Sequence, residues 1–181
     1  GYVVLCPGRP VRFSILWNSA FLPSKHQGTY INHSTMQPDK MLPHLKNAQW
    51  DDKTQRRQLD LLQQIHSEHQ VGRGNASLLN ARVASMETAF RMQFEANEVF
   101  DLERESKQTR AAYGKGHFSN GCLLARRMVE RGVRFVQVYY GNGQPWDTHS
   151  GHDTKVPKLC KDIDQPIAAL LTDLKQRGML D

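Results

Sequence analysis

The stretch Arg134-Phe-Val-Gln-Val-Tyr-Tyr140 decides the fold that we predict for this chain. Its β-branched and aromatic residues lie between Gly132 and Gly141, a pattern typical of a buried strand. The next segment, from Asn142 to Asp153, is rich in Gly, Ser, Asp and His, which predicts a polar loop. From Pro157 to Arg177 apolar residues recur at helical spacing, so a long helix should follow the loop. These apolar residues are Leu159, Ile163, Ile167, Leu170, Leu171 and Leu174.

Strand, loop and helix in this order form the repeating unit of a parallel α/β sheet. Two further segments fit this alternation. Tyr2 to Cys6 is a short apolar run that predicts another buried strand, and Ser119 to Arg131 predicts a helix that leads into the strand at Arg134. In an open sheet of this kind, ligands bind at the carboxyl ends of the strands. We therefore predict an α/β fold with a parallel sheet flanked by helices, and we expect the chemistry in the loop that ends at Asp153.

The segments between these elements are irregular at first and then helical. Residues 9–52 are rich in Pro, Ser, Asn, His and Gln, which predicts a long irregular excursion of a kind that is commonly functional or packed against a partner. Helices are predicted from Thr54 to Gln70, from an N-cap at Asn75 to about Phe100, and from Arg104 to Tyr113. In the second helix one apolar stripe should belong to the core. It consists of Leu79, Val83, Met86, Phe90 and Phe94.

The composition limits the classes of protein that this chain can belong to. With 181 residues, 39% of them apolar and 23% charged, it can form a hydrophobic core. Its net charge of +6 comes from basic residues scattered along predicted helices without interleaved aromatic residues, so no nucleic-acid partner is predicted. No apolar run is long enough to span a membrane. The widely spaced Cys6, Cys122 and Cys160 fit neither a disulfide framework nor a zinc motif, and we expect buried free thiols.

The two ends of the chain suggest an internal piece of a longer protein. The chain begins without Met, within a strand-like run, and ends just after a predicted helix. We treat residues 1–181 as a single incomplete domain. Within it, residues 9–52 form the irregular excursion, residues 53–131 are helical, and residues 132–181 supply the strand, the loop and the last helix.

Four residues in or beside the predicted loop are candidate metal ligands. Asp147 and His149 flank Thr148 just beyond the strand, and His152 and Asp153 follow. Carboxylate oxygens and imidazole nitrogens bind divalent cations, and a loop lets ligands a few residues apart converge. A metal ion there could polarise an ester oxygen or activate a nucleophile. The same residue types also occur in such loops as turn formers and helix caps, and the spacing alone leaves both interpretations open.

The sequence supports no other type of site. His26, His33 and His44 lack a second ligand at fixed spacing and are expected to be surface or hydrogen-bonded side chains, whereas His66 and His69 should lie at a solvated helix end. The chain contains no phosphate-binding loop, dinucleotide-binding glycine motif or nucleophile-elbow motif. A nucleotide cofactor is therefore not predicted.

Longer motifs resemble those of one protein family. They include the run from Leu124 to Val138, the segment Gln144-Pro-Trp-Asp-Thr-His149 and the run from Asp164 to Asp181. The likeness extends upstream through Trp17 to Pro23 and Ala89 to Gln93, so it covers nearly the whole chain. On these motifs the chain resembles DUF1501, a typically bacterial family named as a domain of unknown function.

The resemblance implies both a fold and an activity. The family is placed in the alkaline phosphatase-like superfamily with sulfatases and metal-dependent phosphoglycerate mutases, in which a strand delivers a metal-binding loop with Asp and His. Asp147 and His149 match that loop, with His152 and Asp153 beside them, which implies a divalent metal ion. The implied activity is the metal-dependent hydrolysis or transfer of sulfate or phosphate esters, with a small anionic ester as the substrate.

The chain also departs from the family pattern. By the resemblance, the nucleophile would precede Gly1 and further motifs would follow Asp181, so this segment would carry only part of a site. Relatives often have His where Val156 stands, so a third ligand is not expected at that position. The alternative is a non-catalytic exported binding or scaffold protein that keeps the fold. Relatives carry twin-arginine export signals, which implies an extracytoplasmic location.

Overall fold

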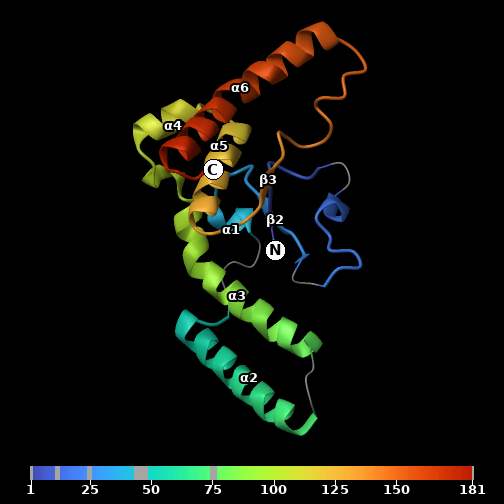
Figure 1. Cartoon of the computed structure of the whole chain (residues 1–181), viewed down its shortest axis with the longest axis vertical. Helices are drawn as coiled ribbons and strands as arrows, with labels where there is room; N and C mark the ends of the chain where they lie inside the picture. Colours follow the sequence, from blue (N-terminus) through green and yellow to red (C-terminus); the bar gives the residue numbers. More distant parts are fainter. Residues whose placement is uncertain (1, 11–12, 24–25, 43–48, 74–76, 181) are drawn as a thin grey trace. The chain divides into compact units, whose positions relative to one another are not determined.

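Three short strands form a parallel sheet in the computed structural model, which describes residues 2–10, 13–23, 26–42, 49–73 and 77–180 (Figure 1). The central strand β1 (Val3–Cys6) lies between β2 (Thr29–Asn32) and β3 (Val136–Val138). Val3 is in register with Thr29 on one side and with Val136 on the other. The predicted α/β fold with a parallel sheet flanked by helices is confirmed. Because the strands run in the same direction, their carboxyl ends share one edge.

Contacts within the chain define two units, and each is described by itself. Unit 1 comprises residues 1–42 and 99–181 and contains the sheet. Unit 2 comprises residues 43–98 and is helical where the structure describes it, apart from residues 49–51.

Strand β3 is shorter and more exposed than the strand predicted from Arg134 to Tyr140. Its pairing with β1 extends by hydrogen bonds from Val3 N to Phe135 O and from Tyr139 N to Leu5 O. All three residues of β3 are half-buried, and Phe135 is 59% exposed. The prediction of a buried strand is therefore wrong. Within the described residues β3 pairs with β1 alone, so one edge of β3 has no strand against it. The buried strand is β1, in which Val4, Leu5 and Cys6 have no exposed surface.

The segment 9–52 contains more regular structure than we predicted. Its elements are the 3₁₀ helix η1 (Phe13–Leu16), the strand β2 and the short helix α1 (Pro38–Met41). β2 has the residue types of a strand, but its four residues are too few for an alternating pattern to stand out among the surrounding prolines. Trp17 stacks on Tyr30 of β2 with the ring centroids 4.8 Å apart, which packs this segment against the sheet.

Helix α5 (His117–Glu130) approaches the sheet closely at a glycine. A Cβ atom added at Gly121 would lie 3.0 Å from Nε2 of His33 and 3.0 Å from Cγ1 of Val138, closer than side chains normally approach. The missing side chain therefore lets α5 lie against the carboxyl ends of β2 and β3. The helix stops just before Gly132, whose φ of +86° turns the chain toward β3, as predicted.

Helix α6 (His152–Gln176) packs against α4 (Lys107–Tyr113) and α5. Together with the 3₁₀ helix η3 (Leu102–Arg104), these helices surround a buried cluster of Tyr113, Cys122 and Leu123. Among the described residues no helix, α6 included, has the length and apolar content needed to cross a membrane.

Arg126 of α5 is the centre of a buried ion-pair network. Its side chain is 2% exposed, and its guanidinium lies 2.7 Å from Glu105, 2.6 Å from Glu130 and 3.1 Å from Asp173 of α6. Burial raises the pKa of the Glu105 and Asp173 carboxyls, but hydrogen bonds and charges from neighbouring arginines outweigh it, and both pKa values are lowered. Since a buried arginine without partners is strongly unfavourable, this network fixes α5 against α6 and the segment around Glu105.

The three cysteines are free thiols, as predicted. Cys6 and Cys122 are buried, and burial raises the pKa of the Cys6 thiol to about 11 and that of Cys122 to about 12. Cys160 is exposed, so the prediction of burial is wrong for this residue. The half-buried residues of α6 near Cys160 are Leu159 and Ile163.

In unit 2, side chains of α2 (Asp52–Arg73) and α3 (Ser77–Phe100) meet through polar contacts. Arg56 donates to both oxygens of Glu87 at 2.8 and 2.6 Å, and its guanidinium lies 5.3 Å from the centroid of the Phe90 ring. The apolar stripe predicted for the core is only partly buried. Val83 and Phe90 are buried, but Leu79, Met86 and Phe94 are 38%, 41% and 49% exposed. The predicted N-cap Asn75 lies outside the described residues.

Candidate functional site

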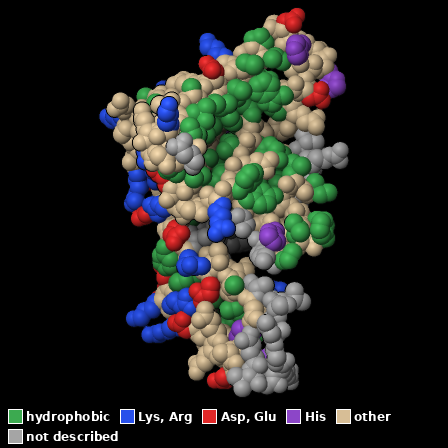
Figure 2. All heavy atoms as spheres, in the orientation of Figure 1, with side chains coloured by type: hydrophobic (Ala, Val, Ile, Leu, Met, Phe, Trp, Pro, Cys, Tyr) green, Lys and Arg blue, Asp and Glu red, His purple; other side chains and the backbone are tan. Residues whose placement is uncertain are grey.

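The loop between β3 and α6 leaves the sheet at its carboxyl edge and carries two of the predicted metal ligands, Asp147 and His149. Oδ2 of Asp147 and Nε2 of His149 are 3.2 Å apart, and the two side chains are 54% and 88% exposed. Figure 2 shows histidine and acidic side chains gathered on the surface around the start of α6. The structure thus brings together two of the four predicted ligands.

His152 and Asp153 lie in α6 rather than in the predicted loop. The helix starts at His152, after Gly151 with a φ of +65°, and continues through Pro157, near which we had predicted its start. A proline is best tolerated in the first turn of a helix, so Pro157 suggested a start near that residue, but in the structure it lies in the second turn. Nδ1 of His152 is 2.8 Å from Oγ1 of Thr148, which ties the loop to the helix. Asp153 is exposed in the first turn, where a carboxylate interacts favourably with the helix dipole.

Asp147 and His149 supply two donors, which is fewer than a metal site requires. Catalytic zinc sites use about three protein ligands. Within the part of the chain that the structure describes, no three His, Cys, Asp or Glu side chains are close enough to hold a metal ion. The carboxylate and the imidazole suit a divalent cation chemically, so the pair could contribute to a site only if other groups complete it.

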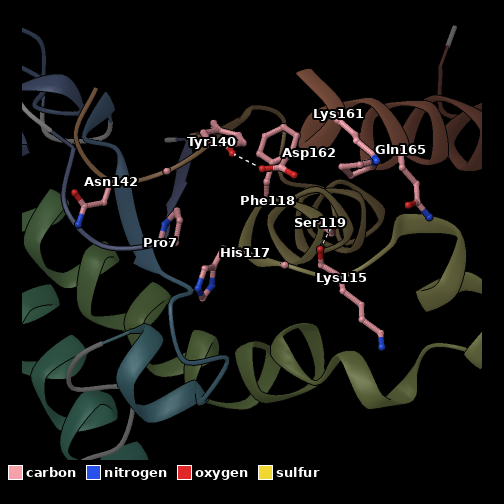
Figure 3. A pocket seen from close by; sticks show the side chains of 13 residues that line it. Pro7, Lys115, His117, Phe118, Ser119, Tyr140, Asn142, Lys161, Asp162 and Gln165 are labelled. Atoms are coloured by element: carbon pink, nitrogen blue, oxygen red, sulfur yellow. Dashed lines mark hydrogen bonds between the residues drawn. The ribbon is translucent and has the colours of Figure 1, made fainter. Parts of the chain in front are cut away.

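A pocket of about 610 Å³ lies at the same carboxyl edge of the sheet, a volume typical of small-molecule sites. Its lining includes Pro7 after β1 and residues 140–142 after β3. Residues 115–119, around the start of α5, form another wall, and Lys161, Asp162, Gln165 and Pro166 of α6 complete the lining. Figure 3 shows Tyr140, Phe118 and Asp162 close together, with Lys115 and Gln165 extending outward. All of them belong to unit 1.

Two lysines give the pocket a positive charge. Among the described residues neither Lys115 nor Lys161 forms an ion pair. The acidic lining residue, Asp162, accepts a hydrogen bond of 3.0 Å from the Tyr140 hydroxyl. Burial, and then this bond, raise the pKa of Tyr140. In Figure 3 the Lys115 side chain extends away from Tyr140, so it would have to turn in order to reach a bound ligand.

The start of α5 adds backbone donors to the pocket. Its N-cap is Gly116, which has no side chain to cap the helix. The N–H of Asn120 bonds to the Gly116 carbonyl at 3.0 Å, so the N–H groups of residues 117–119 precede the bonded turns. A Cβ added at Gly116 would meet nothing within 4 Å, which shows that this end of the helix is open. These N–H groups and the positive end of the helix dipole therefore adjoin the pocket.

A buried histidine ties the end of β2 to the start of α5. His33 has no exposed surface, and its Nε2 lies 3.1 Å from the carbonyl oxygen of His117. Nε2 must carry the proton to donate to a carbonyl, so Nδ1 is unprotonated, and Nδ1 has no hydrogen-bond partner among the described residues. Burial lowers the pKa of His33 to about 4, although the bond to His117 acts in the opposite direction. His33 is therefore neutral near pH 7.

The other histidines are less informative. His26 is exposed, as expected for a surface residue, and His44 lies outside the described residues. His66 hydrogen-bonds to Asn80 and is half-buried, whereas His69 is exposed. The prediction for His33, a hydrogen-bonded side chain, is confirmed.

Sequence reasoning did not identify the pocket. One local signal was present, because Gly114 and Gly116 on either side of Lys115 mark a turn directly before α5. Lys161 and Gln165 are also four residues apart, which places them on the same face of a helix. Their position depends on long-range contacts, since Nε2 of Gln165 donates to the carbonyls of residues 111 and 112 of α4 at 3.1 Å each.

Comparisons with known proteins agree with the resemblance in the sequence. The model of the family DUF1501, described as a protein of unknown function, matches residues 1–181. Neither the curated proteins nor the solved structures gave a significant match. Because the match extends over its whole length, the chain belongs to the DUF1501 family.

Proposed function

We propose that this chain forms the substrate-binding part of a hydrolase or transferase of sulfate or phosphate esters, and that the pocket at the carboxyl edge of the sheet binds the anionic group. One observation carries the proposal. Two lysines that form no ion pair with the described part of the chain and the uncapped start of α5 line the same pocket of about 610 Å³.

The chemistry of the lining favours an oxyanion. Among the described residues the lining contains two ammonium groups, on Lys115 and Lys161, and one carboxylate, on Asp162. The pocket lining therefore has a formal charge of one positive unit. One oxygen of that carboxylate, Oδ2, already accepts a hydrogen bond from the Tyr140 hydroxyl. Sulfate and phosphate esters present several acceptor oxygens, which ammonium and backbone N–H groups at a helix start bind well. Ser119 adds a hydroxyl whose present bond to the Lys115 carbonyl, at 3.4 Å, is long.

A divalent ion at Asp147 and His149 is part of the same proposal. Such an ion would polarise an ester oxygen. In this proposal the loop that carries Asp147 and His149 lies beside the pocket, because residues 140–142 line the pocket and lead directly into that loop. The rings of Tyr140 and Trp146 meet edge to face with centroids 5.5 Å apart, which anchors the loop next to the pocket wall.

The anion site is tested by titration calorimetry with inorganic phosphate and with inorganic sulfate. A double variant, Lys115→Ala with Lys161→Ala, should weaken binding about tenfold or more, because it removes two charge-assisted contacts. The matched control, Lys155→Ala with Lys158→Ala, removes the same charge from exposed positions of α6 outside the pocket. Equal losses in the two double variants would show that only net charge matters and would refute the site.

The reaction is tested in the full-length protein. Metal analysis should find a stoichiometric divalent ion that is lost in Asp147→Ala and in His149→Ala but retained in Asp164→Ala, an exposed carboxylate of α6. Hydrolysis of a phosphate or sulfate ester should fall with the ion. Ester binding without turnover would instead support the alternative, a non-catalytic binding protein. Metal content unchanged by the two substitutions would remove Asp147 and His149 as ligands.

A further inference from the structure

We infer that the ester bound in this pocket carries a ring, and that the flat apolar face of this ring packs against an aromatic wall formed by Phe118 and Tyr140. The inference rests on the proposed function, because it concerns the part of the same ligand that is not anionic. The shared chemistry is a ring face, which an aryl ester and a sugar ester both present.

The aromatic wall adjoins the groups assigned to the anion. Phe118 lies in the first turn of α5, and Tyr140 follows β3. Their ring centroids are 5.6 Å apart with an angle of 47° between the planes, and both residues line the pocket. Both are half-buried, so each keeps surface that a ligand can cover. If the anionic group of a ligand lies at the start of α5, the ligand atoms next to that group would therefore contact Phe118.

The wall is held in place before any ligand binds. The hydroxyl of Tyr140 is bonded to Asp162, and its ring contacts Trp146. Phe118 packs against the buried cluster that contains Tyr113. Two rings that are already fixed lose little conformational entropy when a ligand binds. Most of the free energy of their contact with a ligand ring therefore contributes to the affinity. A short acyclic alcohol offers no flat face and gains less from the same wall.

The remaining polar lining distinguishes the two sources of a ring. Asn142 is exposed at the pocket, and its amide forms no hydrogen bond with the described residues. The hydroxyls of a sugar can use such an amide, whereas a phenyl ring cannot. A preference for the sugar ester that depends on Asn142 would assign the ring as a sugar, and a preference for the phenyl ester would assign it as an aryl group.

The test measures dissociation constants of phenyl phosphate, glucose phosphate and glycerol phosphate for the full chain by calorimetry. At least one ring ester should bind about three- to tenfold tighter than acyclic glycerol phosphate. Phe118→Leu should remove this advantage while glycerol phosphate still binds. Phe135→Leu, which removes an exposed aromatic ring outside the pocket, should leave it unchanged. Tyr140→Phe keeps the ring and should retain most of the advantage.

Two results would overturn the inference. One is equal affinity of wild type for all three esters, which needs no variant and therefore does not depend on how well Phe118→Leu folds. The other is a ring advantage that persists in Phe118→Leu. Failure of the proposed function is distinct, because then no phosphate compound would bind or the Lys115 and Lys161 double variant would bind as well as wild type.

Discussion

Mild acid should destabilise the protein through His33. The folded pKa is about 4, against an ordinary value of 6.5 in an unfolded chain. Between these values the unfolded state binds a proton that the folded state does not. The stability contributed by neutral His33 is therefore present above about pH 6.5 and is lost as the pH falls toward the folded pKa. The linkage relation gives a loss of about 2 kcal/mol at pH 5 and about 3 kcal/mol near pH 4.

The assay is urea unfolding of wild type and His33→Gln at about pH 7.5 and about pH 5, followed by circular dichroism. Glutamine does not titrate, and its amide can still donate to the His117 carbonyl. The difference in free energy of unfolding between the two proteins should shift by about 2 kcal/mol against wild type at the lower pH. Both proteins contain the same carboxylates, so the effect of carboxylate titration on the free energy of unfolding cancels in this difference. His26→Gln, at an exposed position, should follow wild type.

A refuting result is easily recognised. If wild type and His33→Gln lose the same free energy between the two pH values, His33 does not remain neutral in the folded state. The burial of its imidazole, with Nδ1 lacking a hydrogen-bond partner among the described residues, would then not describe the folded protein.

Three further predictions concern the packing of unit 1. Gly121→Ala should lower the free energy of unfolding by about 1–3 kcal/mol, because the added Cβ would overpack the contact with the sheet. Helix propensity alone predicts that alanine raises the free energy of unfolding. The sign of the change measured by urea unfolding therefore decides between close packing and helix propensity. Arg126→Met should cost up to about 3–5 kcal/mol, because it removes the buried cation shared by Glu105 and Asp173, which keep only their pairs with Arg127 and Arg177. Arg104→Met, at a side chain 56% exposed, should change thermal unfolding little. Glu105 and Asp173 have lowered pKa values, so the stability that they contribute is present above their unfolded pKa near about 4 and is lost below it. Acid unfolding of Arg126→Met should therefore be less steep in that range.

Local patterns predicted the elements that are long or strongly apolar. The spacing of Leu159, Ile163 and Leu170 predicted α6, and the run from Tyr2 to Cys6 predicted β1. Burial was predicted less well, because it depends on what lies opposite. The aromatic pattern around Phe135 looks like that of a buried strand, yet β3 has β1 as its neighbour on one side only within the described sheet.

In the candidate site, too, the features that depend on nearby residues were predicted, and those that depend on long-range packing were not. Asp147 and His149 were predicted to lie together because they are neighbours in the sequence, and the structure places them 3.2 Å apart. The pocket could not be predicted in this way, since Tyr140 and Lys115 come from segments that only the packing of α5 and α6 brings together. Residue type predicted polar chemistry at the end of β3, and long-range contacts decide which side chains share it.

The most direct test of the central claim is a crystal structure of the full chain with phenyl phosphate or glucose phosphate, whichever binds more tightly. The phosphate should lie at the start of α5, within hydrogen-bond distance of the N–H groups of residues 117–119, with Lys161 turned toward it. Its ring should lie against Phe118 and Tyr140. A pocket that stays empty with both esters at saturating concentration, or a ligand bound elsewhere on the chain, would contradict the account.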